Sequence, residues 1–207
     1  MIGNLSSRIA HDIRNPLNVI SMNLELMESK SSSEKEINRI NRMIKATKII
    51  TYQVENVLDF VRERPIEQNI IKIGELIEGV LETISVPETV TIQKQDTDII
   101  LKGDKNQLEI LFTNLIINSI QAMNNVGEIK INFETHLGQT IQISISDSGD
   151  GISEKNLEKI FEPLFTTKQH GTGLGLASCK TIVNNHKGTL TVTANPTTFV
   201  VTLPNNT

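Results

Sequence analysis

Apolar residues recur at intervals of three and four along residues 1–64, which is the spacing of amphipathic helices. The polar link Ser31-Ser32-Ser33 divides them into two runs, and Ser33 and Glu36 have the spacing of a capping box at the start of the second. The second run keeps its spacing if Thr47 and Thr51 are counted with it. The pattern predicts an antiparallel helical hairpin. Its apolar positions are Ile2, Leu5, Ile9, Ile13, Leu17, Ile20, Leu24 and Met27, then Ile37, Ile40, Ile44, Val54, Leu58 and Val61.

Two helices alone give these apolar stripes little surface to pack against. Two hairpins assembled as a four-helix bundle would bury the stripes more completely. We therefore expect a homodimer through this region. A monomeric hairpin folded onto the second half of the chain is the alternative.

A boundary is expected at "RERPIEQN", residues 62–69, where Pro65 should end the second helix and polar residues follow. We expect a hairpin domain at 1–64, a linker at 65–71 and a second domain at 72–207. Helical spacing follows at 73–84, 104–124 and 173–187, with Asp104 and Gln107 placed as a capping box. Short or alternating apolar runs predict strands near 90–93, 98–102, 129–133, 141–145, 188–194 and 198–203. The whole is a multidomain chain, an all-α hairpin followed by an α/β sandwich with a mixed sheet covered by helices on one face.

Composition narrows the classes of partner. The chain has 207 residues and a net charge of −4, which argues against a nucleic-acid partner. The single cysteine, Cys179, excludes an internal disulfide framework and a cysteine-rich metal site. No apolar run approaches the ~20 residues that a membrane-spanning helix needs, so we expect no membrane segment in this chain and a cytoplasmic location. A membrane segment or sensor domain upstream is left open.

The expected helix at 104–124 is apolar nearly all round, apart from one narrow polar stripe. The stripe consists of Gln107, Asn114, Asn118 and Gln121. Buried amides must be satisfied, either by neighbouring loops or by a ligand.

Two glycine-rich stretches favour a ligand. "DSGDGI", residues 147–152, directly follows an expected strand and places Asp147 where a carboxylate can accept a hydrogen bond from a purine amine. "GTGLGLA", residues 171–177, leads into a helix whose free N–H groups suit a phosphate chain. The second stretch lacks the Gly-Lys-Ser/Thr ending of a P-loop, and no early strand precedes it as in a Rossmann fingerprint.

In order, "NLIINSIQAM" (114–123), "DSGDGI", "FEPLFTTK" (161–168) and "GTGLGLA" resemble the N, G1, F and G2 boxes of the histidine kinases. "HDIRNPL" (11–17) resembles their H-box, which carries the phosphate-accepting histidine on a dimeric hairpin. The resemblance covers essentially the whole chain, and the residues of the motifs are most similar to those of the nitrogen-regulatory and sporulation kinases. It implies that the second domain is an ATP-binding sandwich of the Bergerat fold, shared with gyrase, MutL and the heat-shock ATPase chaperones.

The resemblance also implies roles within a site for ATP and Mg²⁺. Asn118 would be the metal ligand, Asp147 would bind the adenine amine, and Phe161, Phe165 and Lys168 would belong to the lid. The full nucleotide site would comprise Asn114, Asn118, Gln121, Asp147, Gly149, Gly151, Phe161, Phe165, Lys168, Gly171, Thr172, Gly173, Leu174, Gly175 and Leu176.

The residue at position 114 bears on whether the site can hydrolyse ATP. The ATP-hydrolysing relatives place a glutamate at this position to activate water. An asparagine amide does not take a proton near neutral pH, so it cannot act as a general base. ATP should therefore be held for another nucleophile.

His11 is the implied nucleophile. At about 100° per residue it lies opposite the centre of the apolar stripe, and Asn15 points roughly the same way. Asp12 can bond one ring nitrogen and leave the other free to attack, and Asn15 can position water or phosphate. Pro16 removes a hydrogen bond to the Asp12 carbonyl, so we expect the helix to bend or loosen there.

The resemblance thus implies an ATP-dependent histidine kinase that phosphorylates His11 and passes the phosphoryl group to an aspartate of a response-regulator receiver domain. It allows regulator phosphatase activity as well. A Bergerat-type ATPase and a non-catalytic nucleotide-binding dimer module are the alternatives. The input signal, the cognate regulator and the choice between phosphorylation within and between subunits are not determined by the sequence.

Overall fold

The computed structural model describes residues 2–31, 33–61, 66–136, 139–168 and 171–205. Within the N-terminal helices, the side chains of residues 2–12, 14, 45, 48–49, 52–53 and 55–61 lie outside that description. Pro65, expected to end the second helix, lies outside the described residues. Among the helices of the described ranges, none combines the length and apolarity needed to cross a bilayer.

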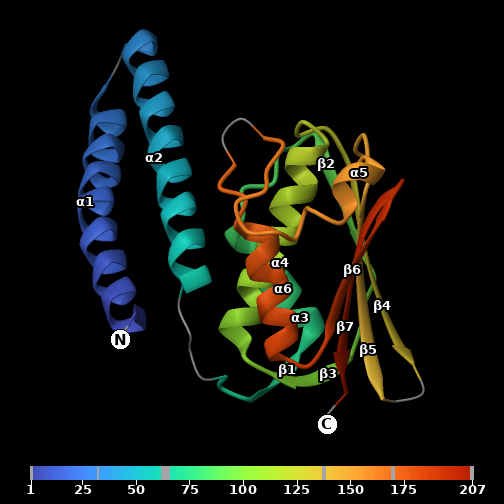
Figure 1. Ribbon diagram of the computed structural model, residues 1–207. Helices are drawn as coiled ribbons and strands as arrows, with labels where there is room; N and C mark the ends of the chain where they lie inside the picture. The colour runs from blue at the N-terminus through green and yellow to red at the C-terminus, as the bar shows by residue number, and fades with distance from the viewer. Residues whose placement is uncertain (1, 32, 62–65, 137–138, 169–170, 206–207) are drawn as a thin grey trace.

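Two long helices, α1 (Ile2–Lys30) and α2 (Glu34–Val61), form the predicted antiparallel hairpin (Figure 1). Leu17 and Leu24 of α1 and Ile40 of α2 are buried. Thr47 is buried too, and its hydroxyl donates to the Met43 carbonyl at 2.9 Å. Because this threonine satisfies its hydroxyl within its own helix, it can occupy an apolar position of the stripe.

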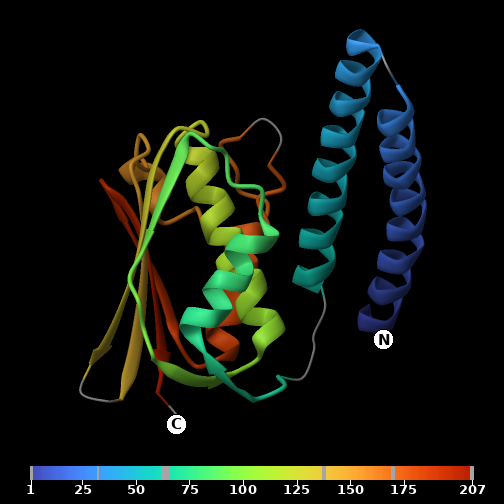
Figure 2. The ribbon, with the colours of Figure 1, turned by 180° about the vertical axis from the view of Figure 1, so that it is seen from behind.

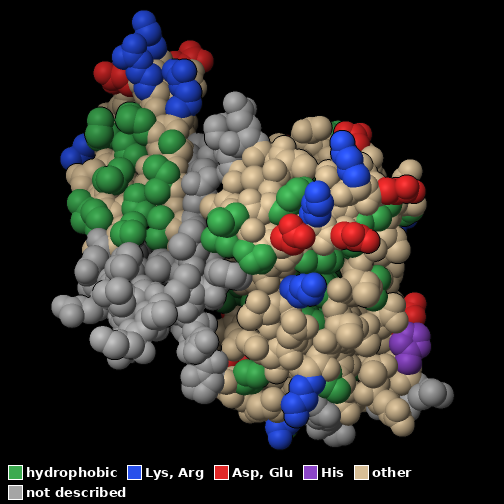
Figure 3. Space-filling model, in the orientation of Figure 1, with side chains coloured by type: hydrophobic (Ala, Val, Ile, Leu, Met, Phe, Trp, Pro, Cys, Tyr) green, Lys and Arg blue, Asp and Glu red, His purple; other side chains and the backbone are tan. Residues whose placement is uncertain are grey.

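The apolar stripe is wider than the seam between the two helices. On α1, Ile20 and Met27 are 47% and 53% exposed, and on α2, Met43 and Ile50 are 44% and 47% exposed. Each follows a buried seam residue by three positions, which turns all four side chains toward one side of the antiparallel pair. We call Ile20, Met27, Met43 and Ile50 the open face. Hydrophobic side chains gather on the hairpin in the space-filling view (Figure 3).

The link between the helices differs in detail from the expected capping box. The Glu36 carboxylate turns back toward the link, but it accepts a hydrogen bond from the hydroxyl of Ser31 at 2.8 Å. Midway along α1, the helix continues through Pro16.

Five strands form a mixed sheet in the order β2-β4-β5-β7-β6, in which β2 and β4 pair in parallel and the other neighbours are antiparallel. A separate antiparallel ladder joins β1 and β3. The strands are β1 (Asn69–Lys72), β2 (Val90–Lys94), β3 (Ile100–Gly103), β4 (Gly127–His136), β5 (Thr140–Asp147), β6 (Thr189–Ala194) and β7 (Thr197–Pro204). The helices of this part are α3 (Ile73–Thr83), α4 (Lys105–Ala122), α5 (Glu154–Leu157) and α6 (Gly175–Asn185).

Helices α3, α4 and α6 cover one face of the sheet, and the hairpin lies on their far side (Figure 2). The register aligns Ile131 with Ile145 and Ile145 with Phe199, and all three are buried. The period-two alternation along β4 and β5 therefore placed the buried face correctly. The predicted α/β sandwich with a mixed sheet is confirmed.

Strand β1 is an element that the hydrophobic pattern did not predict. Its residues 69–71 fall within the segment expected to be a linker, and Ile71 pairs with Leu101 of β3. A strand this short carries too little periodicity to be recognised, and its partner is distant in the sequence.

Asp104 joins three segments of the chain. Its carboxylate accepts the amide hydrogen of Gln107 at 3.1 Å, which is the predicted cap of α4, and that of Glu67 at 3.1 Å. Its own amide donates to Nε2 of the buried His186 at 2.9 Å, so Nδ1 carries the hydrogen and donates to the Ile182 carbonyl. The reciprocal half of the capping box is therefore wrong. The histidine takes the place of the Gln107 side chain, whose Oε1 is buried with no hydrogen-bond partner in the described part of the chain.

Candidate nucleotide and phosphoacceptor sites

The polar stripe of α4 faces the glycine-rich stretches. Asn114 is 2% exposed, and its Nδ2 donates to the Ile110 carbonyl at 3.1 Å. Its Oδ1 lies 3.1 Å from where a Cβ would stand on Gly175, so a side chain there would crowd the amide. One turn on, Asn118 is half-buried, and Gln121 is exposed. The stripe thus runs from the start of α6 outward to solvent.

Asp147 is the last residue of β5, and the two oxygens of its buried carboxylate differ in their hydrogen bonding. The side chain is 3% exposed. Oδ1 accepts the Gly149 amide hydrogen at 3.0 Å, whereas Oδ2 is buried with no hydrogen-bond partner among the described residues. Desolvation raises the pKa of Asp147, and the hydrogen bond from Gly149, the hydroxyl of Ser119 and the charge of Lys168 oppose that shift. A buried acceptor without a donor is costly, so Oδ2 is suited to a donor from a ligand.

The first glycine-rich stretch packs tightly beside this carboxylate. A Cβ on Gly149 would stand 2.9 Å from the Ala122 carbonyl oxygen at the end of α4. Gly151 has φ +84°, a left-handed conformation, and a Cβ there would stand 2.7 Å from the Ala194 carbonyl oxygen. Both glycines are needed for the backbone to pass between α4 and the end of β6.

The second stretch is tied to the segment before it. Gly173 has φ +68°, and a Cβ there would collide with the backbone of Leu164, whose amide donates to the Gly173 carbonyl at 3.0 Å. The Thr172 hydroxyl accepts the Leu174 amide hydrogen at 3.3 Å. Leu174 is buried, and Leu176 packs partly buried against the core. The two leucines therefore anchor the start of α6.

The expected lid is attached at both aromatic residues. Phe161 and Phe165 pack, partly buried, against the hydrophobic core, and Nζ of Lys180 stands 5.6 Å from the Phe161 ring centroid. At the far end, the Gly171 amide donates to the Lys168 carbonyl at 3.3 Å. The lid segment is therefore fixed to the core on one side and to the second glycine-rich stretch on the other.

Lys168 reaches from the lid to the polar stripe of α4. Its Nζ donates to Asn118 Oδ1 at 2.9 Å and to Gln121 Oε1 at 2.6 Å. Although much of the side chain is exposed, desolvation around the ammonium lowers the pKa of Lys168, and the negative charge of Asp147 opposes that shift. The amide oxygen of Asn118, which the resemblance assigns to the metal, and that of Gln121, which it assigns to the wider nucleotide site, thus converge on one cation.

His11 and Asp12 lie in α1, and their side chains fall outside the described residues. Asn15, four residues after His11, is exposed. Further along α1, Val19, Met22 and Leu26 are 56%, 57% and 49% exposed. Steps of four, three and four put them with Asn15 on one helix face, opposite the buried seam. We call Val19, Met22 and Leu26 the outer row.

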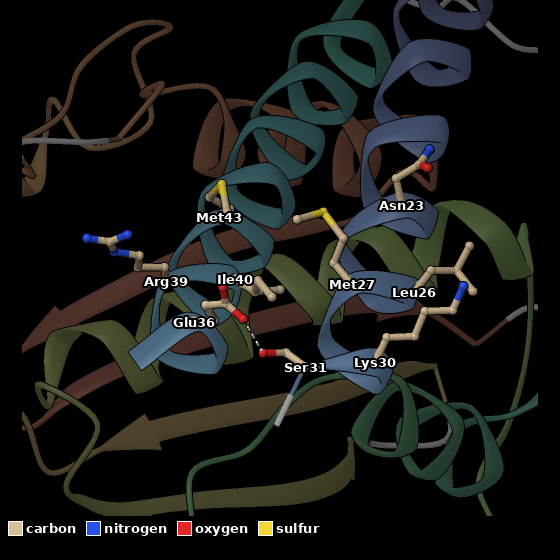
Figure 4. Close-up of a pocket in the computed structure, with 9 residues that line it drawn as sticks. All are labelled: Asn23, Leu26, Met27, Lys30, Ser31, Glu36, Arg39, Ile40 and Met43. Atoms are coloured by element: carbon tan, nitrogen blue, oxygen red, sulfur yellow. Dashed lines mark hydrogen bonds between the residues drawn. The ribbon is translucent and has the colours of Figure 1, made fainter. Parts of the chain in front are cut away.

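An open hollow lies at the closed end of the hairpin (Figure 4). Met27 and Met43 of the open face point into it, and the hydrogen bond between Ser31 and Glu36 closes its end. The hollow therefore belongs to the open face. Its lining residues are Asn23, Leu26, Met27, Lys30, Ser31, Glu36, Arg39, Ile40 and Met43.

Ser119 is a site residue that the sequence did not indicate. It is fully buried, and its hydroxyl lies close enough to the Asp147 carboxylate to lower the pKa of that group, although it makes no hydrogen bond of ordinary geometry within the described part of the chain. A hydroxyl directly after Asn118, on a helix otherwise apolar at that angle, was the available signal.

Two family models match the chain. The model described as "Histidine kinase-, DNA gyrase B-, and HSP90-like ATPase" matches residues 103–207, about half of the sequence. The chain belongs to this family. The model of the His Kinase A (phospho-acceptor) domain matches residues 1–65, and the two together are the catalytic core of a two-component histidine kinase.

Individual histidine kinases support this assignment. The chain is 31% identical over 216 residues to the signal transduction histidine-protein kinase AtoS of Escherichia coli K12, covering 99% of this chain and 35% of that protein. It is 32% identical to sporulation kinase A of Bacillus subtilis, covering 98% and 34%. The chain thus spans about a third of the length of these relatives.

Solved structures share the fold. Full-length ShkA in complex with AMPPNP superposes with a TM-score of 0.77 at 19% identity, covering 99% of this chain and 46% of that one. Histidine kinase ThkA in complex with response regulator protein TrrA gives a TM-score of 0.65 at 27% identity, covering 99% and 62%.

Proposed function

We propose that this histidine kinase core uses ATP to phosphorylate its own His11 and then supplies the phosphoryl group to an aspartate of a response-regulator receiver domain. The observation that carries the proposal is the site beside α4. There, Asp147 keeps a buried oxygen without a partner among the described residues, next to Gly149, and two amide oxygens of α4 already bind the ammonium of the lid lysine.

The residues fit Mg²⁺·ATP. Asp147 Oδ2 would accept from the adenine amine, which would satisfy its buried lone pair. The amide oxygen of Asn118 is the hard donor that Mg²⁺ prefers, and the metal would neutralise charge on the phosphates. The stretch Gly171–Gly175, fixed by Leu174 and Leu176, would line the phosphates. AMPPNP in the complex of ShkA, which shares the fold, agrees with a nucleotide site.

The site favours transfer over hydrolysis. Asn114 is buried and its amide is engaged with the Ile110 carbonyl, so it offers no group that can take a proton from water. A nitrogen of His11 would form the bond to the γ-phosphorus as the bond to the leaving ADP breaks. Asp12 would take or share the other ring proton, and positioning would supply most of the acceleration.

The open face supports the expected homodimer. Four large apolar side chains on one side of a hairpin, with a hollow between two of them, are suited to a second copy of the same hairpin. The hairpin matches the phospho-acceptor domain model over its whole length.

The outer row supports the regulator as partner. It continues the exposed face of Asn15 along α1, and Val19 and Met22 stay exposed when the open face is covered, because they lie on a different side of the helix, whereas Leu26 also lines the hollow beside the open face. A receiver domain that takes phosphate from His11 must dock on this side. ThkA, with which this chain shares 27% identity, has been solved with a response regulator. ATP and receiver domains are found in the cytoplasm, and we place the chain there.

Labelled ATP tests the proposal. Incubation with Mg²⁺ and γ-labelled ATP should give an acid-labile phosphoprotein, and His11→Gln should abolish it while leaving ADP affinity nearly intact. His136→Gln, which changes an exposed histidine of β4, is the matched control and should keep full labelling. Release of free phosphate without a phosphoprotein would indicate an ATPase, and neither product would indicate a binding module.

A further inference from the structure

The lid lysine makes a contact that nucleotide binding would have to break. We propose that, in the nucleotide-free protein, Lys168 stands in for the metal ion: its ammonium occupies the Asn118 oxygen and must leave before Mg²⁺ can bind there. This inference rests on the proposed nucleotide site and adds a means of regulating it.

The geometry of the ammonium is that of a bound cation. Nζ lies 2.9 Å from Asn118 Oδ1 and 2.6 Å from Gln121 Oε1, so one charged group bridges two amides one turn apart on α4. An ammonium has three donors and no acceptor, and it is satisfied by oxygens of the kind that Mg²⁺ also selects. Charge-assisted bonds of this length are stronger than those between neutral groups.

The two cations exclude one another. Mg²⁺ would need the same Asn118 oxygen at a shorter distance than the ammonium keeps. A divalent ion and an ammonium on one oxygen would repel each other strongly, because this region is partly shielded from water. Binding of the metal therefore requires release of the lysine.

Release of the lysine also removes a contact between its segment and α4. The Lys168 amide donates to the Thr166 hydroxyl at 3.0 Å, and its carbonyl accepts from the Gly171 amide at 3.3 Å. Because these bonds hold the backbone of Lys168 to Thr166 and Gly171, the ammonium links a locally ordered stretch of the lid to α4. The contact thus keeps the lid against α4 in the empty protein and gives way when Mg²⁺·nucleotide enters.

A double-mutant cycle tests the contact. Hydrogen exchange of the amides of residues 161–168 is measured for wild type, Lys168→Met, Gln121→Leu and the double variant, first with EDTA and no nucleotide, then with saturating Mg²⁺·ADP. Without nucleotide, Lys168→Met should speed exchange about tenfold, as expected for loss of a charge-assisted hydrogen bond, and adding Gln121→Leu should give little further increase. With Mg²⁺·ADP the interaction between the two changes should disappear. Lys159→Met, which alters an exposed lysine just before Phe161, should match wild type in both conditions.

Three results would overturn the inference. These are unchanged lid exchange in nucleotide-free Lys168→Met, fully additive effects of the two changes, and an interaction that persists with Mg²⁺·ADP bound. Binding of Mg²⁺·ADP to wild type is measured beforehand by calorimetry. Absence of binding would overturn the proposed function and this inference with it, whereas normal binding with unchanged lid exchange would overturn this inference alone.

Discussion

One carboxylate oxygen of Asp147 accepts the amide hydrogen of Gly149 at 3.0 Å, and the other oxygen is buried and unsatisfied within the described part of the chain. The first oxygen fixes the orientation of the group, and the second is presented to a ligand. A structural aspartate at the end of a strand would be expected to use both oxygens.

Asp147→Asn should weaken ADP binding about tenfold to a hundredfold. The amide loses the charge of the acceptor and can turn its NH₂ toward the adenine amine, and a hydrogen bond to a charged group contributes ~1.5–3 kcal/mol. Isothermal titration calorimetry measures the change. Asp150→Asn alters an exposed acid of the same stretch and should bind ADP as wild type does. Equal affinities for wild type and Asp147→Asn would contradict the adenine contact.

ADP affinity should fall on acidification sooner than an ordinary aspartate would predict. Burial raises the pKa of Asp147, so the carboxylate is protonated at a higher pH and loses its acceptor charge there. The stability of the nucleotide-free fold should respond with the opposite sign. The folded state binds this proton more tightly than the unfolded state does, so this group favours folding at low pH and loses that contribution as pH rises toward its raised pKa. Calorimetry of wild type and Asp147→Asn across the acidic range checks the first point, because the variant should lack this component of the pH dependence.

Met27→Glu should dissociate the homodimer. A carboxylate on the open face would be buried without a partner, which raises the dimer dissociation constant at least about a hundredfold if it costs ~3 kcal/mol. Sedimentation equilibrium measures the change. Met22→Glu makes the same chemical change on the outer row and should remain dimeric. Two variants with the same dissociation constant would mean that the open face is not the dimer surface.

Met22→Glu should instead slow phosphotransfer to the regulator. Its autophosphorylation should be normal, because the residue lies on α1 far from the nucleotide site, while a charge in an apolar contact should reduce the transfer rate about tenfold or more. The rate is followed as loss of label from the phosphorylated kinase when the cognate receiver domain is added. Transfer as fast as in wild type would remove the outer row from the docking surface.

Asn15→Ala should lose much of any regulator phosphatase activity while it keeps substantial autophosphorylation. The exposed amide can hold a water in line with an aspartyl-phosphate, but it is neither nucleophile nor base in the forward reaction. Phosphorylated regulator is mixed with each protein and ADP, and the remaining phosphoaspartate is measured. Equal dephosphorylation by the two proteins would exclude this role for Asn15.

Local patterns predicted most of the fold. Alternation along β4 and β5 identified their buried faces, and the residues before α4 identified its first turn, because both features depend on neighbours in the sequence. The second half of the capping box failed since His186, 82 residues away, takes the Asp104 amide. Strand β1 was missed for the same reason, because its partner is not local.

The site was predicted in its composition but not in its contacts. From the glycine-rich stretches and the polar stripe, the sequence predicted that Asp147, Asn118 and Gln121 belong to one site. In the structure, all three lie near Lys168. No spacing rule indicates that Lys168 bonds to Asn118, because the lid reaches α4 through long-range packing. Likewise, the width of the apolar stripe on α1 was visible, but its division into a covered seam and an open face depends on how α2 packs.

The hydrogen bonds of Asp104 connect the segment at Glu67 to the first turn of α4, and α4 leads from there to the proposed nucleotide site. The carboxylate holds the Glu67 amide at the start of this helix, and Asn118 stands fourteen residues further along the same helix, about 21 Å away. A movement of the segment at Glu67 would be passed, through one hydrogen bond and one stiff helix, to the residue proposed to bind the metal. The chain therefore contains a short route by which a movement outside the sandwich could alter nucleotide use without displacing the sheet.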